Sequence, residues 1–433
     1  MDKSHKGYLI VLFFVSPFLG LLNIFKLRNE KEIVFFVMLF FGLAGSVAVF
    51  EKGSDGFTHR FNAEKDYLDM TLPQFVEKSY QILSFNSVEG STDIYIHSIS
   101  FLSASILQAP DLTHVFSALV LGFFFSKSVL LVLKDNLNAK KGAILLGCIA
   151  LFLLIRSLGA LNSIRMWTGM WVLFYGTYSW ALTKEKKYLF VSLFAVFVHF
   201  SYGVILIPVI IGYLLQNRKI LLVTIYAVSF FSTLGFNVVE SYIPQSKLIE
   251  SKQKTYGITS DEDEDRYEDN EEIRKVANEN SNFYKSIGQQ IYFSYSIVGL
   301  SIILIFFYLR KDVDVNLKFL VATGLSIYLF SNLVAFSPSL QFRTKMIAAT
   351  FILASAIHLQ LRLNNYNLSK KNSRRLNIGL VAFLISSIPV ALFHLSYLLQ
   401  MISFFIFLFP EISWLLGDGD YSIRNVLGLV IGK

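Results

Sequence analysis

The sequence is poor in charged residues and in cysteine. Only 16% of its 433 residues are charged, whereas a soluble globular chain carries about 25% because its surface must stay in water. The one cysteine, Cys148, lies in an apolar run, which excludes a disulfide framework and a cysteine-based metal site. The chain also lacks a Walker-type phosphate loop, a Gly-x-Ser-x-Gly nucleophile elbow and a His/Glu zinc spacing. An ATP-driven pump, a serine hydrolase and a metalloprotease are therefore disfavoured, and no metal or cofactor is expected.

Apolar and aromatic residues take the place of the missing charge. Hydrophobic residues make up 54% of the chain, which includes 42 Phe and 21 Tyr, and the mean hydropathy is +0.53. A helix needs about 20 mostly apolar residues to cross the roughly 30 Å hydrocarbon core of a bilayer. We therefore predict an all-α polytopic membrane protein, one integral membrane domain over residues 1–433, with about 12 to 14 transmembrane helices.

The expected spans follow one another along most of the chain. The clearest are Gly7–Phe25, Glu32–Phe50, Leu112–Leu133, Gly142–Ile155, Met166–Leu182, Tyr188–Val198, Val204–Leu215, Leu221–Val239, Gln290–Leu309, Leu317–Phe336, Ile347–Leu361 and Leu376–Leu395. The Ser-rich segment Ile94–Leu107 and the run Leu398–Phe409 are weaker additions. No small-residue cleavage site follows the first span, so we expect it to be retained and not removed as a signal peptide.

Two long polar stretches, residues 51–93 and 240–289, interrupt this pattern. Each is too long and too charged to lie in lipid, so we expect amphipathic helical caps on one membrane face. The second stretch contains five consecutive acidic residues, 261–265. Such a block is most often solvated, and we do not read it as a metal site.

Basic residues in the short loops predict the orientation. The net charge of +8 comes largely from Lys and Arg between apolar runs, which indicates cytoplasmic loops and not nucleic-acid binding. Placing the basic loops around residues 134–141, 184–187, 218–219, 310–318 and 362–375 inside satisfies alternation from residue 134 onward. The polar stretches then face outward. With 51–93 outside, residues 94–133 must cross an odd number of times, so Ile94–Leu107 is either a cap or a re-entrant helix.

Charged and polar residues near the apolar spans are functional candidates, because burial in a bilayer is costly. Arg165 opens the span that contains Trp167 and Gly169. It is either a snorkelling anchor at a helix end or a cation that holds a diphosphate through bidentate hydrogen bonds. Arg343, which begins another outward-starting helix, has the same two readings.

Three further candidates lie at a helix break and in the first polar stretch. His199 stands where two short apolar runs meet, and it is either a satisfied packing residue or a hydrogen-bonding group with a near-neutral pKa. Asp55 lies close to His59 and Arg60 and has the chemistry of a base toward a sugar hydroxyl. Asp93 opens the next helix, where a plain cap is the alternative.

Five short motifs follow in chain order: Ser54-Asp55 with His59-Arg60-Phe61; Asp93-Ile94-Tyr95; Ile164-Arg165-Met166-Trp167-Thr168-Gly169; Lys186-Lys187 with His199-Phe200-Ser201; and Gln341-Phe342-Arg343. The ordered set resembles the EpsG-type branch of the Wzy-like polysaccharide polymerases, from residue 54 to about 345. The family more often has Ala where Gly169 stands, and the acidic block 261–265 is not a family feature.

The resemblance implies a metal-independent membrane glycosyltransferase of the bacterial cytoplasmic membrane. Its substrates would be oligosaccharide repeat units on undecaprenyl diphosphate, and a chain-length regulator would be a further partner. Arg165, Arg343 and Arg60 would bind the diphosphate. His199 would orient or protonate it, and Asp55 or Asp93 would position or deprotonate the attacking hydroxyl.

Two other functions remain open at this stage. A flippase or exporter of lipid-linked oligosaccharide would need a cationic pathway across the membrane, but the candidates here cluster on one face. A membrane O-acyltransferase would use a buried His with a cytoplasmic acyl donor, whereas His199 is predicted to face outward. The sugars, the linkage and the product, whether capsule, exopolysaccharide or O-antigen, are not determined by the sequence.

Overall fold

The computed structural model of the chain describes residues 3–24, 27, 29–50, 54–84, 93–133, 142–155, 157–231, 288–335, 337–363, 366, 369–416 and 421–431. These residues form helices and no strand, with two isolated β-bridges, Ala48 to Ile402 and Ser403 to Ser422. Buried apolar side chains from most helices join in one extensive core. The prediction of an all-α polytopic membrane protein is confirmed.

The N-terminal helices pack beside a long membrane helix. α1 (Lys3–Val15) and α2 (Pro17–Ile24) precede α3 (Glu30–Ser46), which packs along α7 (Leu112–Leu133). Asn29 caps α3, because its side-chain oxygen accepts the Lys31 amide at 2.9 Å.

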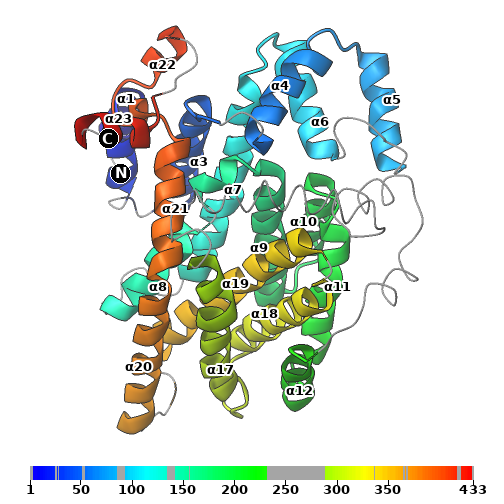
Figure 1. Ribbon diagram of the computed structural model, residues 1–433, viewed down its shortest axis with the longest axis vertical. Coiled ribbons are helices and arrows are strands. Elements are labelled where there is room, and N and C mark those ends of the chain that lie inside the picture. Colours follow the sequence, from blue (N-terminus) through cyan, green and yellow to red (C-terminus); the bar gives the residue numbers. More distant parts are fainter. Residues whose placement is uncertain are drawn as a thin grey trace.

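Four short elements between α3 and α7 lie together at the upper end of the molecule in Figure 1: α4 (Asp55–Tyr67), α5 (Leu72–Leu83), α6 (Ile94–Ser100) and the π-helical turn η1 (Phe101–Ile106). Ser54 caps α4 by accepting the Phe57 amide. Thr71 and Gln74 form a capping box at the start of α5. We call α4, α5, α6 and η1 the outer cap.

The centre of the protein is built from α8 (Ala143–Leu154), the turn η3 (Leu158–Leu161), α9 (Ile164–Thr183), α10 (Lys187–Val198), α11 (Tyr202–Leu215) and α12 (Lys219–Ser229). α9 is buried along most of its length, with Trp171 and Phe174 fully enclosed. α10 packs against α9, and α11 packs against α18 (Val315–Leu333). Asp314 caps α18 by accepting two backbone amides.

The C-terminal half adds η4 (Tyr292–Ser296), α17 (Ile297–Tyr308), α19 (Pro338–Leu361), α20 (Lys370–Ser386), α21 (Ile388–Met401), η6 (Phe404–Ile406), α22 (Glu411–Leu416) and α23 (Ile423–Ile431). The predicted span Leu398–Phe409 is wrong. α21 ends at Met401, because Ile402 and Ser403 are extended and bridge to Ala48 and Ser422.

Within the described residues, four helices are long and apolar enough to cross a bilayer: Leu112–Leu133, Ala143–Leu161, Gly288–Tyr308 and Ser339–Leu361. α20 and α21, bent by 44° where they meet, could form a fifth span. This is fewer than the roughly 12 to 14 expected from apolar length. Some helices, such as α10, are short, and α9 carries Trp, Tyr and Thr side chains that face protein instead of lipid.

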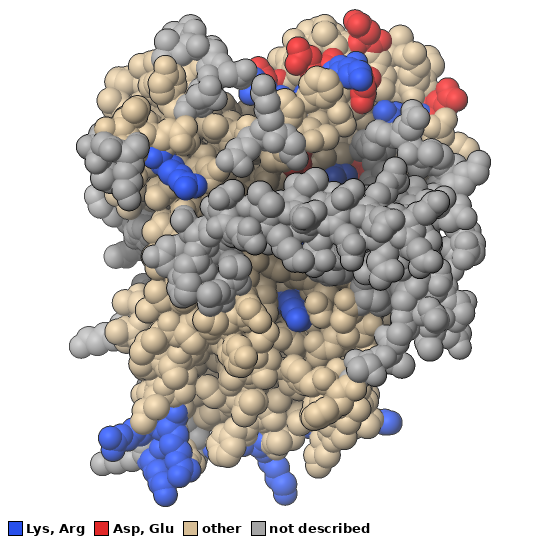
Figure 2. Space-filling view, in the orientation of Figure 1, with Lys and Arg blue, Asp and Glu red and all other residues tan. Residues whose placement is uncertain are grey.

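Charge is distributed as the positive-inside rule requires. Figure 2 shows basic side chains at the lower end of the molecule, below α17 and α20, and acidic ones at the upper end over the outer cap. The basic residues that open α20 include Lys371, Arg374 and Arg375. The positive-inside rule therefore predicts a cytoplasmic lower end and an extracytoplasmic outer cap.

The two ends of the segment Ile94–Ile106 contact different helices. Its first turn contacts the start of α9 through Asp93, and its last turn reaches the end of α4, where the Ser105 hydroxyl donates to the Tyr67 carbonyl. The segment is shorter than the helices that could cross a bilayer, whereas α7 is long and apolar enough to do so. These observations favour the reading of Ile94–Leu107 as a cap or re-entrant helix, with α7 as the one crossing between residues 94 and 133. The stretch 240–289 lies outside the described residues, except for Gly288 and Gln289.

Candidate functional site

A buried ion pair joins two of the predicted site residues at the outer end of α9. The Arg165 Nη1 atom lies 2.7 Å from Asp93 Oδ2, and the Asp93 side chain is 0% exposed against 21% for Arg165. The other carboxylate oxygen, Oδ1, accepts the Phe200 amide at 2.8 Å. Asp93 makes no side-chain cap bond to its own helix α6. Its carboxylate therefore serves tertiary structure, tying α6, α9 and the break between α10 and α11 to one point.

His199 lies in that break, with extended backbone between the end of α10 and Ser201. Its Nδ1 atom is 2.9 Å from the Ser201 hydroxyl and 3.2 Å from the Ser201 amide. Because the amide can only donate, Nδ1 is its acceptor. That arrangement leaves Nε2 as the protonated nitrogen of the neutral ring.

Tyr202, the first residue of α11, locks the break against α9. Its hydroxyl donates to the Met166 carbonyl at 2.6 Å. A Cβ atom at Gly169 would come within 2.3 Å of the Tyr202 ring, so only glycine leaves room for this ring without a shift. Arg343, near the start of α19, is close enough for its charge to act on the Tyr202 hydroxyl.

The N-terminus of α4 docks on the turn before α9. The Ser163 hydroxyl donates to Asp55 Oδ2 at 3.1 Å, and the Gly56 amide donates to Asn162 Oδ1 at 2.9 Å. The Asn162 amide in turn donates to the Tyr397 hydroxyl at 2.6 Å. Asp55 itself is exposed. The solvent-facing carboxylate of Asp55 is thus held by Ser163, which precedes Arg165 by two residues.

His59 joins this group, although its place in the motif alone did not predict a role in the site. Its Nε2 atom is buried and has no hydrogen-bond partner among the described residues. Burial lowers the pKa of His59 well below its usual value, and the nearby charge of Arg165 adds to that shift. The available signal was spacing, since residues 55 and 59 are four apart and share one face of α4.

Arg60 points elsewhere. Its Nε atom pairs with Asp111 Oδ1 at 2.7 Å, just before α7, and both side chains are well exposed. The structure thus brings Asp55, Asp93, Arg165 and His199 together with His59, which we call the outer cluster. Arg343 approaches it through Tyr202, and Arg60 lies on the other side of α4.

α10 is short for a membrane-spanning helix. It has 12 residues and starts at Lys187. Such a helix rises about 18 Å, well short of the roughly 30 Å of hydrocarbon. Its partner α9 has 20 residues, which rise about 30 Å, and carries Arg165 in its first turn. The irregular backbone at His199 is therefore expected to line protein or a polar cavity.

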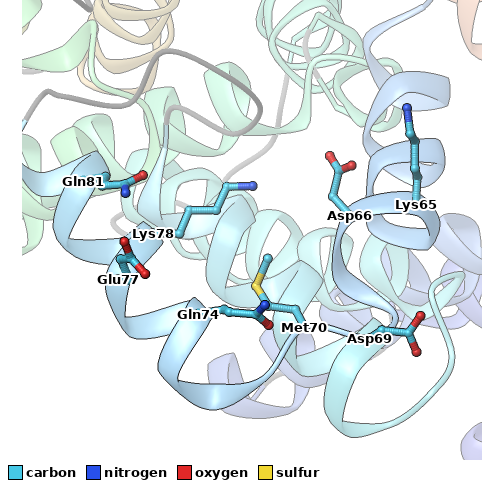
Figure 3. Close-up of a pocket in the computed structure, with 8 residues that line it drawn as sticks. All are labelled: Lys65, Asp66, Asp69, Met70, Gln74, Glu77, Lys78 and Gln81. Carbon is cyan, nitrogen blue, oxygen red and sulfur yellow. The ribbon is translucent and has the colours of Figure 1, made fainter.

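A separate polar cavity of about 430 Å³ lies between α4 and α5, farther out. Figure 3 shows Gln74, Glu77, Lys78 and Gln81 along one side of α5, facing Lys65 and Asp66 from α4. Lys78 lies over the Tyr67 ring at 5.0 Å. Among the described residues, no group of three or more His, Cys, Asp or Glu side chains could hold a metal ion.

One comparison with known proteins identifies the chain. The family model described as the EpsG family matches residues 111–387, well over half of the sequence. The chain belongs to the EpsG family. A search of curated proteins and a search of solved structures found no match. EpsG membership implies a role in polysaccharide polymerisation by a multi-pass membrane protein.

The EpsG match covers only part of the outer cluster. Its members Arg165 and His199 lie within residues 111–387, whereas Asp55, His59 and Asp93 precede them. The contacts of Asp93 with Arg165 and Phe200 nevertheless tie the unmatched N-terminal part to the matched part. The resemblance stated from short motifs and the match of the EpsG model agree on the family.

Proposed function

We propose that this protein is a polymerase that joins undecaprenyl-diphosphate-linked oligosaccharide repeat units at the outer face of the bacterial cytoplasmic membrane. The observation that carries the proposal is Arg165, a partly exposed guanidinium held by buried Asp93 in the first turn of α9. A lipid diphosphate presents its charge at the membrane surface, because its tail stays in hydrocarbon.

The reaction is a glycosyl transfer. A sugar hydroxyl of the acceptor attacks the anomeric carbon of the donor, a new C–O bond forms, and the bond from that carbon to the diphosphate oxygen breaks. The electron pair leaves with the diphosphate. Arg165, with Arg343 nearby, stabilises this developing negative charge, as preorganised cations do in other transferases. Asp93 keeps the Arg165 side chain in place before substrate arrives.

The remaining members of the outer cluster have complementary roles. The acceptor hydroxyl must lose a proton, and exposed Asp55, held by Ser163, is the carboxylate placed to accept it. His199 and neutral His59 supply ring nitrogens for hydrogen bonds to the diphosphate. Neither histidine needs to carry a charge to donate one bond.

The polar cavity between α4 and α5 suits the glycan part of the substrate. Carboxylate and amide oxygens accept hydrogen bonds from sugar hydroxyls, and the amides of Gln74 and Gln81 also donate them. The helices α4 and α5 that line the cavity lie at the upper end of the molecule, above α9 (Figure 1). A growing chain anchored at the cluster would extend past this cavity.

The test uses purified protein in nanodiscs with lipid-diphosphate-linked repeat units, without added nucleotide or metal. We expect a gel ladder of lengthening glycans that Arg165→Ala abolishes and Arg165→Lys weakens, because Lys cannot form the bidentate contact. Arg374→Ala, at the exposed cytoplasmic start of α20, is the matched control and should leave the ladder intact. Movement of intact lipid-linked units across the bilayer without a ladder would make the protein a transporter.

A further inference from the structure

A second cavity lies on the other side of α4 from the outer cluster. It has a volume of about 430 Å³ and is bounded by the outer part of α3, the start of α7 and two C-terminal serines. We call it the lateral groove.

The groove has an apolar body and a polar end. Side chains such as Leu39, Val115 and Leu119 line its walls, whereas Arg60, Asp111 and His114 lie together at the outer side. Such a division fits an amphiphile whose head group faces outward and whose tail lies among the helices. The size of the cavity accommodates the part of a lipid tail next to the head group, not a whole long tail.

One buried polar atom in the groove lacks a partner. The His114 ring is 3% exposed, its Nε2 atom contacts the Gly56 carbonyl at 3.0 Å, and its Nδ1 atom is without a hydrogen bond among the described residues. With Nε2 donating to that carbonyl, Nδ1 is an acceptor. A buried acceptor left unpaired costs free energy, which a ligand hydroxyl, such as that of a sugar next to the diphosphate, would recover.

α4 connects the lateral groove with the outer cluster. His59 on this helix feels the charge of Arg165, and the adjacent Arg60 pairs with Asp111 at the groove. The Gly56 carbonyl bonds His114, while the Gly56 amide bonds Asn162 beside the cluster. One helix thus separates two places where an anionic head group can meet a cation.

We propose that the lateral groove binds the polyprenyl diphosphate of a second lipid-linked substrate, while the outer cluster binds the first. This inference rests on the proposed function, because a polymerase must hold two lipid-linked units side by side. Arg60 attracts the diphosphate at the groove mouth, and Asp111 holds Arg60 in place until the diphosphate competes for it.

The experiment counts undecaprenyl diphosphate molecules bound per chain by native mass spectrometry. We expect two on the wild-type protein, and one on Val115→Trp, which fills the groove. Val228→Trp, on an exposed part of α12, is the matched control and should retain two. Two molecules bound to Val115→Trp with unchanged affinity, or displacement from the groove by phosphatidylglycerol at equal concentration, would overturn the proposal.

Variants at the groove mouth test the same site without disturbing its packing. Arg60→Gln should weaken the second binding event about tenfold, in line with a charge-assisted contact to phosphate. Asp111→Asn should strengthen it, because Arg60 then has no competing carboxylate. Equal weakening by both variants would contradict the assignment. These readouts need no turnover, so an inactive protein that binds two lipids would refute only the proposed function.

Discussion

At the residue scale, Asp93 shows how burial determines the cost of removing a charge. Asp93→Asn leaves the Arg165 guanidinium without its carboxylate in a largely dry setting. We expect the free energy of unfolding to fall by about 3 kcal/mol, the scale for breaking a buried pair. Thermal unfolding in detergent measures this loss.

The exposed pair Arg60–Asp111 provides the comparison. Its side chains are 39% and 72% exposed, so Asp111→Asn should change stability by less than about 1 kcal/mol. A second check is the double variant Asp93→Asn with Arg165→Gln, which should be destabilised less than the two single effects added together. Equal costs for the buried and the exposed carboxylate would contradict this view of the cluster.

His59 links diphosphate binding to pH. Burial and Arg165 lower its pKa, so the free protein holds a neutral ring near pH 7. A bound diphosphate adds negative charge and raises that pKa. Affinity should therefore increase as pH falls from about 7 toward the lowered pKa, by at most about tenfold per pH unit for one proton. Calorimetry in two buffers measures the proton taken up.

The same lowered pKa of His59 gives the stability of the ligand-free protein the opposite pH dependence to that of diphosphate affinity. The unfolded chain protonates its histidine near pH 6.5 while the folded one does not, so stability should fall as pH drops below about 6.5. His59→Gln should abolish both pH dependences attributable to this ring. If the variant keeps the proton uptake on binding, another group is responsible, such as the diphosphate itself.

At the element scale, the contact between α9 and α11 depends on the absence of a side chain at Gly169. Gly169→Ala would place a Cβ atom 2.3 Å from the Tyr202 ring and displace it from Met166. We expect a loss of about 1–3 kcal/mol from overpacking, together with lower polymerase activity because the His199 break shifts. Thermal unfolding and the gel ladder measure the two effects.

Gly203→Ala is the matched control for this substitution. A Cβ atom at Gly203 would meet only Val196 at 3.8 Å, an ordinary contact, at the exposed start of the same helix α11. It should leave stability and activity near those of the wild type. Similar losses in both variants would indicate a general intolerance of alanine in this region and not a specific clash with Tyr202.

At the scale of the whole molecule, we predict an extracytoplasmic outer cap and a single crossing, by α7, between residues 94 and 133. Gln108 is exposed between η1 and α7. In a Cys148→Ala background, Gln108→Cys should react with a membrane-impermeant maleimide added from outside to intact cells. Lys371→Cys, at the basic start of α20, should react only after the membrane is opened. The reverse result for Gln108 would mean that Ile94–Ile106 crosses the bilayer.

Sequence patterns predicted the site only in part. Asp55, Asp93, Arg165 and His199 were chosen one by one, each for a local reason such as a helix start or a break. The contact of Asp93 with both Arg165 and Phe200 could not be foreseen, because these residues are 72 and 107 positions away. His59 was not predicted as a site residue, because only the structure shows that its Nε2 atom is buried without a hydrogen-bond partner among the described residues.

The sequence by itself determined the all-α membrane class and the EpsG family, since hydropathy and short motifs are local properties. Loop charge, also local, predicts the cytoplasmic side. Tertiary structure decided what local patterns cannot. It set the two ends of Ile94–Ile106 against α9 and α4, directed Arg60 to Asp111, and buried the charge of Asp93 against Arg165. These outcomes depend on which helix ends contact one another, and those contacts are determined by packing across the whole chain.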